Sequence, residues 1–193
     1  MKKTIFGIEF DEGYDSKNIP ILFPVQNIRI GKNTKIGKGT FIRSNVVING
    51  DATIGKNCHI GNFTLIRAFV NIGSDTKIGA TNIIELYATI GNNCRTQSFC
   101  LVAEHSKVGN NVFLGPYFAN PADNTIGESL FNLEQEYLAQ PAIIEDDVRI
   151  GAKVTLKPGI TIKKGTIIGM GSLVTKDTEN NSLFYGSPAR RIK

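Results

Sequence analysis

The chain has 193 residues and a formal net charge of +5, from 22 Lys and Arg against 17 Asp and Glu. Its lysines stand singly rather than in a basic tract, which argues against nucleic-acid binding, although a basic surface would attract a phosphate-rich small molecule. No uninterrupted apolar run approaches the roughly 18 residues of a membrane-spanning helix. The first residues, MKKTIFGIEFDEG, lack a signal-peptide pattern, so we expect a cytoplasmic protein of one domain.

A strict six-residue period follows residues 1–29, which we interpret as an N-terminal capping segment. An aliphatic residue recurs at every sixth position from Ile30 to Leu114 except Thr96, and again from Ile144 to Val174. A small or β-branched residue follows four positions later at most repeats, with Asn82 and Phe118 as departures. The aliphatic series comprises Ile30, Ile36, Ile42, Ile48, Ile54, Ile60, Ile66, Ile72, Ile78, Ile84, Ile90, Val102, Val108, Leu114, Ile144, Ile150, Leu156, Ile162, Ile168 and Val174. Neither the helical period nor simple strand alternation explains this spacing, so it predicts a solenoid.

The repeat stops at Asn120 and resumes after about Pro141. A loop of this length inside a solenoid is usually functional. Residues 128–140 within it have the composition of a short helix. The loop is therefore a candidate recognition element.

Residues 30–119 and 142–179 resemble the left-handed parallel β-helix of the hexapeptide-repeat acyltransferases. The resemblance implies an all-β fold in which three hexads form one coil of about 18 residues. About seven coils would then form a domain over residues 30–179, with the excursion loop 120–141 and a short C-terminal tail at 180–193. It also implies a homotrimer with active sites in the clefts between the prisms.

Two further segments narrow this resemblance. The stretches ITIKKGTIIGMGSLVTKD and YGSPARRI resemble the closing signature of members that use acyl-CoA. Residues 108–121, the loop and residues 143–162 resemble the N-acetyltransferases that modify amino sugars on nucleotide carriers. In that branch the loop asparagine often lies farther from the Gly-Pro pair than Asn120 does from Pro116, so the role of Asn120 stays open.

His105 is the candidate general base. Acyl transfer from a thioester requires that the acceptor lose a proton, and imidazole side chains titrate near neutral pH. On the coil geometry, Glu104 and His105 lie at a corner one coil below the loop, so we expect the loop root beside them. Glu104 would orient or charge-stabilise the imidazole. Two alternatives remain: His105 only binds the acceptor, or it is an exposed corner residue without a role.

Acceptor and donor contacts follow from the same resemblance. Tyr117, Asn120 and Asn124 are candidates to hydrogen-bond the sugar. Small residues would let the pantetheine arm of coenzyme A approach the backbone, and basic residues would meet its phosphates. The candidates for coenzyme A are Gly151, Ala152, Gly169, Gly171, Lys176, Arg190 and Arg191. The alternative for the glycines is that they only allow the coil to turn. The alternative for the basic residues is that they are solvated side chains of the C-terminal tail.

The cysteines are predicted to fill the core. Cys58 and Cys94 lie two coils apart on the small inner position, about 9.6 Å at the usual strand spacing, too far for a disulfide. Cys100 occupies an equivalent position on another face, and His59 is expected to face outward in a different column from His105. The gamma-class carbonic anhydrases share this fold but bind zinc through three histidines. The chain has two, so we expect no metal site.

These observations favour an acyl-CoA-dependent N-acyltransferase that moves acetyl from acetyl-CoA to the amine of a nucleotide-linked amino sugar. One alternative is O-acetylation of a sugar or another small hydroxyl compound. A second alternative is a non-catalytic β-helix scaffold. The expected partners are coenzyme A, the small-molecule acceptor and two further copies of the chain.

Overall fold

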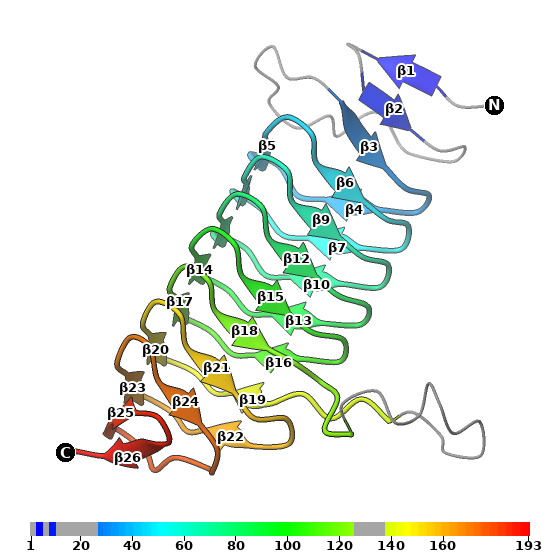
Figure 1. Ribbon diagram of the computed structural model, residues 1–193. Coiled ribbons are helices and arrows are strands. Elements are labelled where there is room, and N and C mark those ends of the chain that lie inside the picture. Colours follow the sequence, from blue (N-terminus) through cyan, green and yellow to red (C-terminus); the bar gives the residue numbers. More distant parts are fainter. Residues whose placement is uncertain (1–2, 6–7, 11–26, 126–137) are drawn as a thin grey trace.

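The structure is a computed structural model that describes residues 3–5, 8–10, 27–125 and 138–193. Within these ranges the chain forms strands and turns and no helix. The strands stack coil upon coil along one prism, with the N-terminal strands at one end and the C-terminal hairpin at the other (Figure 1). The short helix predicted within residues 128–140 lies mostly outside the described residues.

Three sheets form the sides of the prism, here named sheets A, B and C. Sheet A contains β1 (Lys3–Ile5), β2 (Ile8–Phe10), β3 (Ile28–Ile30), β6 (Val47–Ile48), β9 (Leu65–Ile66), β12 (Ile83–Ile84), β15 (Leu101–Val102), β18 (Ala119–Asn120), β21 (Thr155–Leu156) and β24 (Leu173–Val174). Sheet B contains β4 (Lys35–Ile36), β7 (Thr53–Ile54), β10 (Asn71–Ile72), β13 (Thr89–Ile90), β16 (Lys107–Val108), β19 (Ile143–Ile144) and β22 (Thr161–Ile162). Sheet C contains β5 (Phe41–Ile42), β8 (His59–Ile60), β11 (Lys77–Ile78), β14 (Arg95–Thr96), β17 (Phe113–Leu114), β20 (Arg149–Ile150), β23 (Ile167–Ile168), β25 (Leu183–Gly186) and β26 (Ala189–Arg191).

The strands from β3 to β24 pair in parallel, and each residue pairs with the equivalent residue one coil away. Ile72 pairs with Ile90, for example, whereas Val108 pairs with Ile144 because the loop is inserted between them. Strands β3 to β23 form seven coils of three strands, and β24 starts an eighth. The predicted parallel β-helix of about seven coils is therefore confirmed.

Both ends of the helix carry antiparallel pairs. The hairpin β1–β2 adds to sheet A because β2 pairs in parallel with β3. At the other end β25 pairs with β23 and turns back as β26. Residues 183–191 therefore extend sheet C.

Each coil has three corners, named here by the sheets they join. A residue with positive φ occupies each described corner except the one that carries the loop, including Tyr87 and His105 at the AB corner, Phe99 and Tyr117 at the CA corner, and Asn111 at the BC corner. Non-glycine residues seldom adopt this conformation, and asparagine does so most readily. The aromatic residues at the AB and CA corners are therefore a departure from ordinary turn chemistry.

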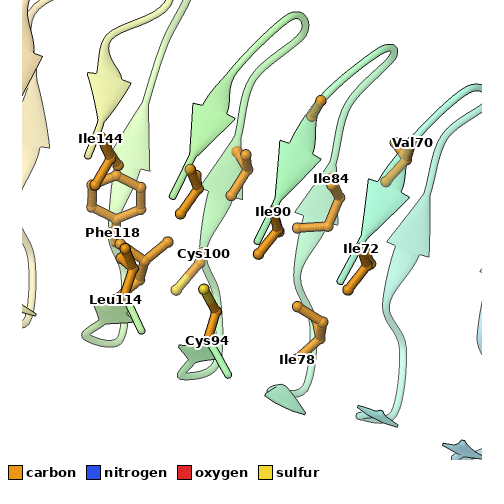
Figure 2. Close-up of a cluster of buried hydrophobic side chains, with 14 of the residues drawn as sticks. Val70, Ile72, Ile78, Ile84, Ile90, Cys94, Cys100, Leu114, Phe118 and Ile144 are labelled. Atoms are coloured by element: carbon orange, nitrogen blue, oxygen red, sulfur yellow. The ribbon is translucent and has the colours of Figure 1, made fainter. Parts of the chain in front are cut away.

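The inward positions of all three sheets form one continuous core. The aliphatic residues of the six-residue series are buried, and side chains from successive coils stack inside the prism (Figure 2). Phe118 is the large residue at a small-residue position, and it is 1% exposed, beside Leu114 and Ile144 (Figure 2). The sequence period therefore encodes the interior of the molecule.

The two departures Asn82 and Thr96 meet in the core. The Asn82 Nδ2 donates to Thr96 Oγ1 at 2.7 Å and to the Gln97 carbonyl at 2.9 Å, while its Oδ1 accepts from the Cys100 N–H at 2.6 Å. Thr76 occupies the same position of the preceding repeat as Asn82. Its hydroxyl joins two neighbouring coils in the same way, because it accepts a hydrogen bond from the Cys94 N–H. A buried polar group needs such partners, and the Thr96 hydroxyl adds one to the Asn82 amide, which also donates to the Gly79 carbonyl.

We expect Thr96→Val to lower the free energy of unfolding by about 0.5–1.5 kcal/mol, because the buried Asn82 amide loses its shortest hydrogen bond and keeps only the carbonyls of Gly79 and Gln97 as acceptors. The double variant Asn82→Thr/Thr96→Val reproduces the regular pattern of Thr76 and should recover most of that loss. Urea unfolding of wild type, both single variants and the double variant measures the coupling. A double variant as unstable as the sum of the singles would contradict the pairing.

Candidate active site

His105 lies at an AB corner with its ring exposed and its backbone held. The turn is closed by the Ser106 N–H donating to the Ala103 carbonyl at 3.2 Å, and the His105 N–H donates to the Leu86 carbonyl of the coil below at 2.9 Å. The φ of His105 is 56°, which turns its side chain outward from the corner. The corner therefore presents an imidazole on a rigid scaffold, as catalysis by positioning requires.

An aromatic stack supports this imidazole. The His105 ring lies flat against Tyr87, with centroids 5.0 Å apart and an interplanar angle of 12°, and Tyr87 lies on Phe69 at 4.9 Å. Stacking of this kind fixes the orientation of the imidazole ring. Sequence reasoning missed this support, although Phe69, Tyr87 and His105 recur at the spacing of one coil.

The root of the loop lies beside His105, as predicted. The Asn120 Nδ2 donates to the hydroxyl of Ser106, the residue after His105, at 3.1 Å and to the Ala142 carbonyl at 3.1 Å. The Ala142 N–H donates to Asn120 Oδ1 at 3.0 Å, and the Gln140 N–H donates to the Ala122 carbonyl at 2.9 Å. The departing and returning ends of the loop are thus fastened together next to the candidate base.

Asn120 is consequently not displayed to a ligand. Asn120 stands in the aliphatic column of sheet A, where it pairs with Val102. Its side chain is fully buried, and its amide hydrogen-bonds to Ser106 and Ala142. We expected a contact with the acceptor sugar, and this geometry gives that expectation no support. Asn124 is exposed in the described part of the loop, where Asp123 accepts from the Thr125 N–H and hydroxyl at 2.7 Å.

Glu104 and Tyr117 are placed less favourably for a contact with His105 within one chain. Glu104 is half-buried, and in the described part of the chain no hydrogen bond joins it to His105. Tyr117 stacks on Phe99 at 4.9 Å at the CA corner, on the opposite edge of sheet A. Of the expected acceptor residues, only Asn124 follows directly from the loop root beside His105.

The small residues expected to meet coenzyme A gather at the CA corner of two successive coils, but they are not equally open. A Cβ on Gly151 would lie 2.6 Å from the backbone nitrogen of Met170, so close stacking of coils requires glycine there. A Cβ on Gly169 would lie 2.2 Å from Tyr185, whose ring covers it. Gly171, with φ of 69°, has nothing within 4 Å. Ala152 is half-exposed and lies next to Gly151.

The basic candidates lie near the same end of the prism. Lys176 is exposed after β24, and Arg190 and Arg191 are exposed on β26. Arg191 forms an ion pair with Glu179, whereas the Arg190 Nη1 donates to the Ala189 carbonyl. The tip of the C-terminal hairpin is fixed to this corner because the Gly186 N–H donates to Ser172 Oγ at 3.1 Å.

The cysteines are core residues, as predicted. Cys58, Cys94 and Cys100 are free and buried. Burial raises the pKa of each thiol, and that of Cys100 to about 11. Since the thiolate is the reactive form, none of the three is suited to act as a nucleophile.

We therefore expect the three thiols of the folded protein to react slowly with Ellman's reagent at mildly alkaline pH. All three should react rapidly in urea, because unfolding restores solvent and the ordinary thiol pKa. Stopped-flow absorbance measures both rates. A thiol that reacts equally fast in both conditions would show that burial does not protect it.

His59 faces outward on β8, away from the AB corner. It accepts a hydrogen bond from Arg43 Nε at 3.3 Å and packs edge-on against Phe41. Its pKa is lowered by burial and then by the charges of Arg43 and Lys77.

Across the described ranges no three His, Cys, Asp or Glu side chains gather as a metal site would need. No described segment forms a helix capable of spanning a membrane.

Comparison with known proteins identifies the repeat. Residues 33–68 and 141–176 match the family model "Bacterial transferase hexapeptide (six repeats)". A Schizosaccharomyces pombe protein, C18B11.09c, provisionally named an acetyltransferase, is 49% identical over 53 residues, which are 28% of this chain and 26% of that protein. The 2,3,4,5-tetrahydropyridine-2,6-dicarboxylate N-acetyltransferase of Staphylococcus aureus (strain JH9) is 44% identical over 55 residues, 28% of this chain and 23% of that enzyme.

The matched segment spans about a quarter of each curated relative. Among solved structures, LpxA from Acinetobacter baumannii matches with a TM-score of 0.52 at 18% identity, over 95% of this chain and 73% of that chain. This likeness concerns the fold. The six-residue repeat and the three-sided coil agree with the family match, so residues 33–68 and 141–176 are similar to the hexapeptide repeats of bacterial transferases.

Proposed function

We propose that the protein is an acyl-CoA-dependent N-acyltransferase that transfers acetyl from acetyl-CoA to the amine of a nucleotide-linked amino sugar. The observation that carries the proposal is His105: an exposed imidazole, stacked on Tyr87 and adjoining the fastened root of the loop. A scaffold coil has no need of this arrangement. The named acetyltransferases among the relatives support the reaction class.

In the proposed reaction the acceptor nitrogen attacks the thioester carbonyl while His105 takes its proton. The carbon–nitrogen bond forms, the carbon–sulfur bond breaks, and the departing coenzyme A sulfur receives a proton to give the thiol. No covalent intermediate on the enzyme is required, which agrees with the buried cysteines. Asn124 and the loop would contact the acceptor, and Glu104 would act on the imidazole only after a change of side-chain conformation.

The donor would lie at the CA corner, where Gly171 and Ala152 leave the backbone accessible and Arg190 provides positive charge, whereas Lys176 follows β24 toward the AB corner. Within one chain this corner and the His105 corner lie on opposite edges of sheet A. A ring of identical chains pairs unlike surfaces, so a neighbouring copy would bring its CA corner to the AB corner of the first. We therefore include a homotrimer in the proposal.

The outer face of sheet A supports this assembly. Ile83 is 41% exposed between Phe99 and Tyr117 on one edge and Tyr87 on the other, all of them large exposed apolar residues. An exposed patch of this kind is typical of a protein interface. The outward residues at Val47, Leu65, Leu101 and Ala119 continue the apolar column.

We expect Ile83→Lys to shift the protein from trimer to monomer and to abolish activity, because a charge would be buried against the neighbouring copy. Light scattering coupled to gel filtration measures the mass. Lys107→Glu, on the polar outer face of sheet B, is the control and should leave the mass unchanged. A wild-type monomer would contradict the assembly.

A panel of nucleotide-linked amino sugars and their hydroxyl counterparts, with free thiol release from acetyl-CoA followed over time, tests the reaction. Turnover only with amines supports the proposal, and turnover with hydroxyl compounds identifies an O-acetyltransferase. Absence of both turnover and coenzyme A binding would leave the scaffold as the remaining explanation.

A further inference from the structure

A second polar site lies on the outer face of sheet C, away from the His105 corner. The outward residues of this face, in the order of strand pairing, are Phe41, His59, Lys77, Arg95, Phe113, Arg149, Ile167 and Leu183. The column holds three permanent positive charges and no carboxylate. The lowered pKa of His59 reflects burial first and then the same positive field, from Arg43 and Lys77.

A depression of about 310 Å³ opens in the middle of this face. It is lined by Asn93, Arg95, Asn111, Val112, Phe113 and Arg149. Its volume lies at the lower end of the range for small-molecule sites. The two arginines lie two coils apart, about 9.6 Å along the sheet, and the Phe113 ring lies between them. Two cations thus flank an aromatic surface in a concave site.

The two guanidinium groups are not neutralised by carboxylates among the described residues. Arg149 is held across the coil by Nη1, which donates to the Asn111 and Val148 carbonyls, so its Nε and Nη2 remain available. Asp147, the corner residue one coil above Asn111, pairs with Lys164 at 3.5 Å and accepts from Asn111. Arginines without acidic partners favour bidentate binding of phosphate oxygens, and Arg149 is anchored for this by its two carbonyl contacts.

We propose that this depression binds an organic diphosphate, with the phosphates between Arg95 and Arg149 and a base stacked on Phe113. A base–aromatic contact tolerates any base because each has a π-face. The ligand class rests on the proposed function, because a nucleoside diphosphate unit occurs in both the nucleotide-linked acceptor and coenzyme A. The binding itself can be measured without turnover.

Isothermal titration of the intact protein with UDP and with inorganic pyrophosphate tests the site. Arg95→Gln should weaken UDP binding about tenfold or more. Lys77→Gln, which removes the same charge one coil away but outside the depression, should change it less than about threefold. Phe113→Leu should weaken UDP binding and leave pyrophosphate binding unchanged. An Arg95→Gln variant that binds like wild type, an equal effect of Lys77→Gln, or no UDP binding by the wild type would overturn the proposal.

Competition identifies the source of the diphosphate. If coenzyme A displaces UDP and also loses affinity in Arg95→Gln, the site holds the donor. If both bind together, the depression is separate from the donor site, and a raised acceptor KM in Arg95→Gln would assign it to the acceptor. His105→Ala should retain UDP binding. UDP binding without turnover of any acceptor would contradict the proposed function alone, whereas turnover with an Arg95→Gln variant that binds UDP normally would contradict the diphosphate site alone.

Discussion

His105→Ala is expected to lower kcat by about 10²- to 10⁴-fold, with little change in the KM of the acceptor. A general base acts in the transition state, so its removal affects the chemical step more than ground-state binding. The truncation should not disturb the coil, because His105 is exposed and its corner is held by backbone hydrogen bonds to Leu86 and Ala103. Initial rates at varied acceptor concentration measure both constants.

His59→Ala is the matched control, since the second histidine lies on β8 and contacts Arg43 and Phe41 instead. Its kcat should equal that of wild type. The kcat of Tyr87→Leu should lie between those of His105→Ala and wild type, because the imidazole loses its stacking partner but can still accept a proton. If His105→Ala raises only KM, the residue binds the acceptor and is not the base.

Asn120→Ala is expected to lower the free energy of unfolding by about 3–5 kcal/mol, because the variant leaves the buried N–H and carbonyl of Ala142 without a partner and opens a cavity. It should also release the loop root from Ser106. Acceptor KM should therefore rise even where the protein remains folded. Chemical denaturation, followed by kinetics below the transition, measures the two effects.

Asn124→Ala supplies the contrast, because the same residue type is exposed a few positions later in the loop. We expect its stability to stay within about 0.5 kcal/mol of wild type, while its acceptor KM rises if the side chain contacts the sugar. An Asn120→Ala protein with wild-type stability would show that the loop root is held by other contacts.

Much of the fold follows from one periodic pattern. The aliphatic position every six residues places Ile72, Ile90 and their equivalents inside, because pairing between coils is in register and a strand exposes alternate residues to alternate faces. Even the irregularities Asn82 and Thr96 could be located from the sequence. Their hydrogen bond could not, because it joins residues on different sheets of the coil.

The candidate site was only partly predictable. The proximity of His105 to the loop follows from counting coils, and the structure confirms it through Ser106 and Asn120. The same count cannot tell whether Asn120 points into the prism or out of it, because that depends on where the chain leaves the sheet. The roles expected for Gly151 and Gly169 likewise depend on contacts with Met170 and Tyr185 in later segments.

The sequence by itself determined the coil, its core and the corner that carries His105, because each depends on a local period repeated through the chain. Only the tertiary structure decided that Asn120 fastens the loop, that Tyr185 covers Gly169, and that Arg95, Phe113 and Arg149 line one depression. The physical reason is that these contacts join residues of different coils and depend on side-chain direction, which a six-residue period does not specify.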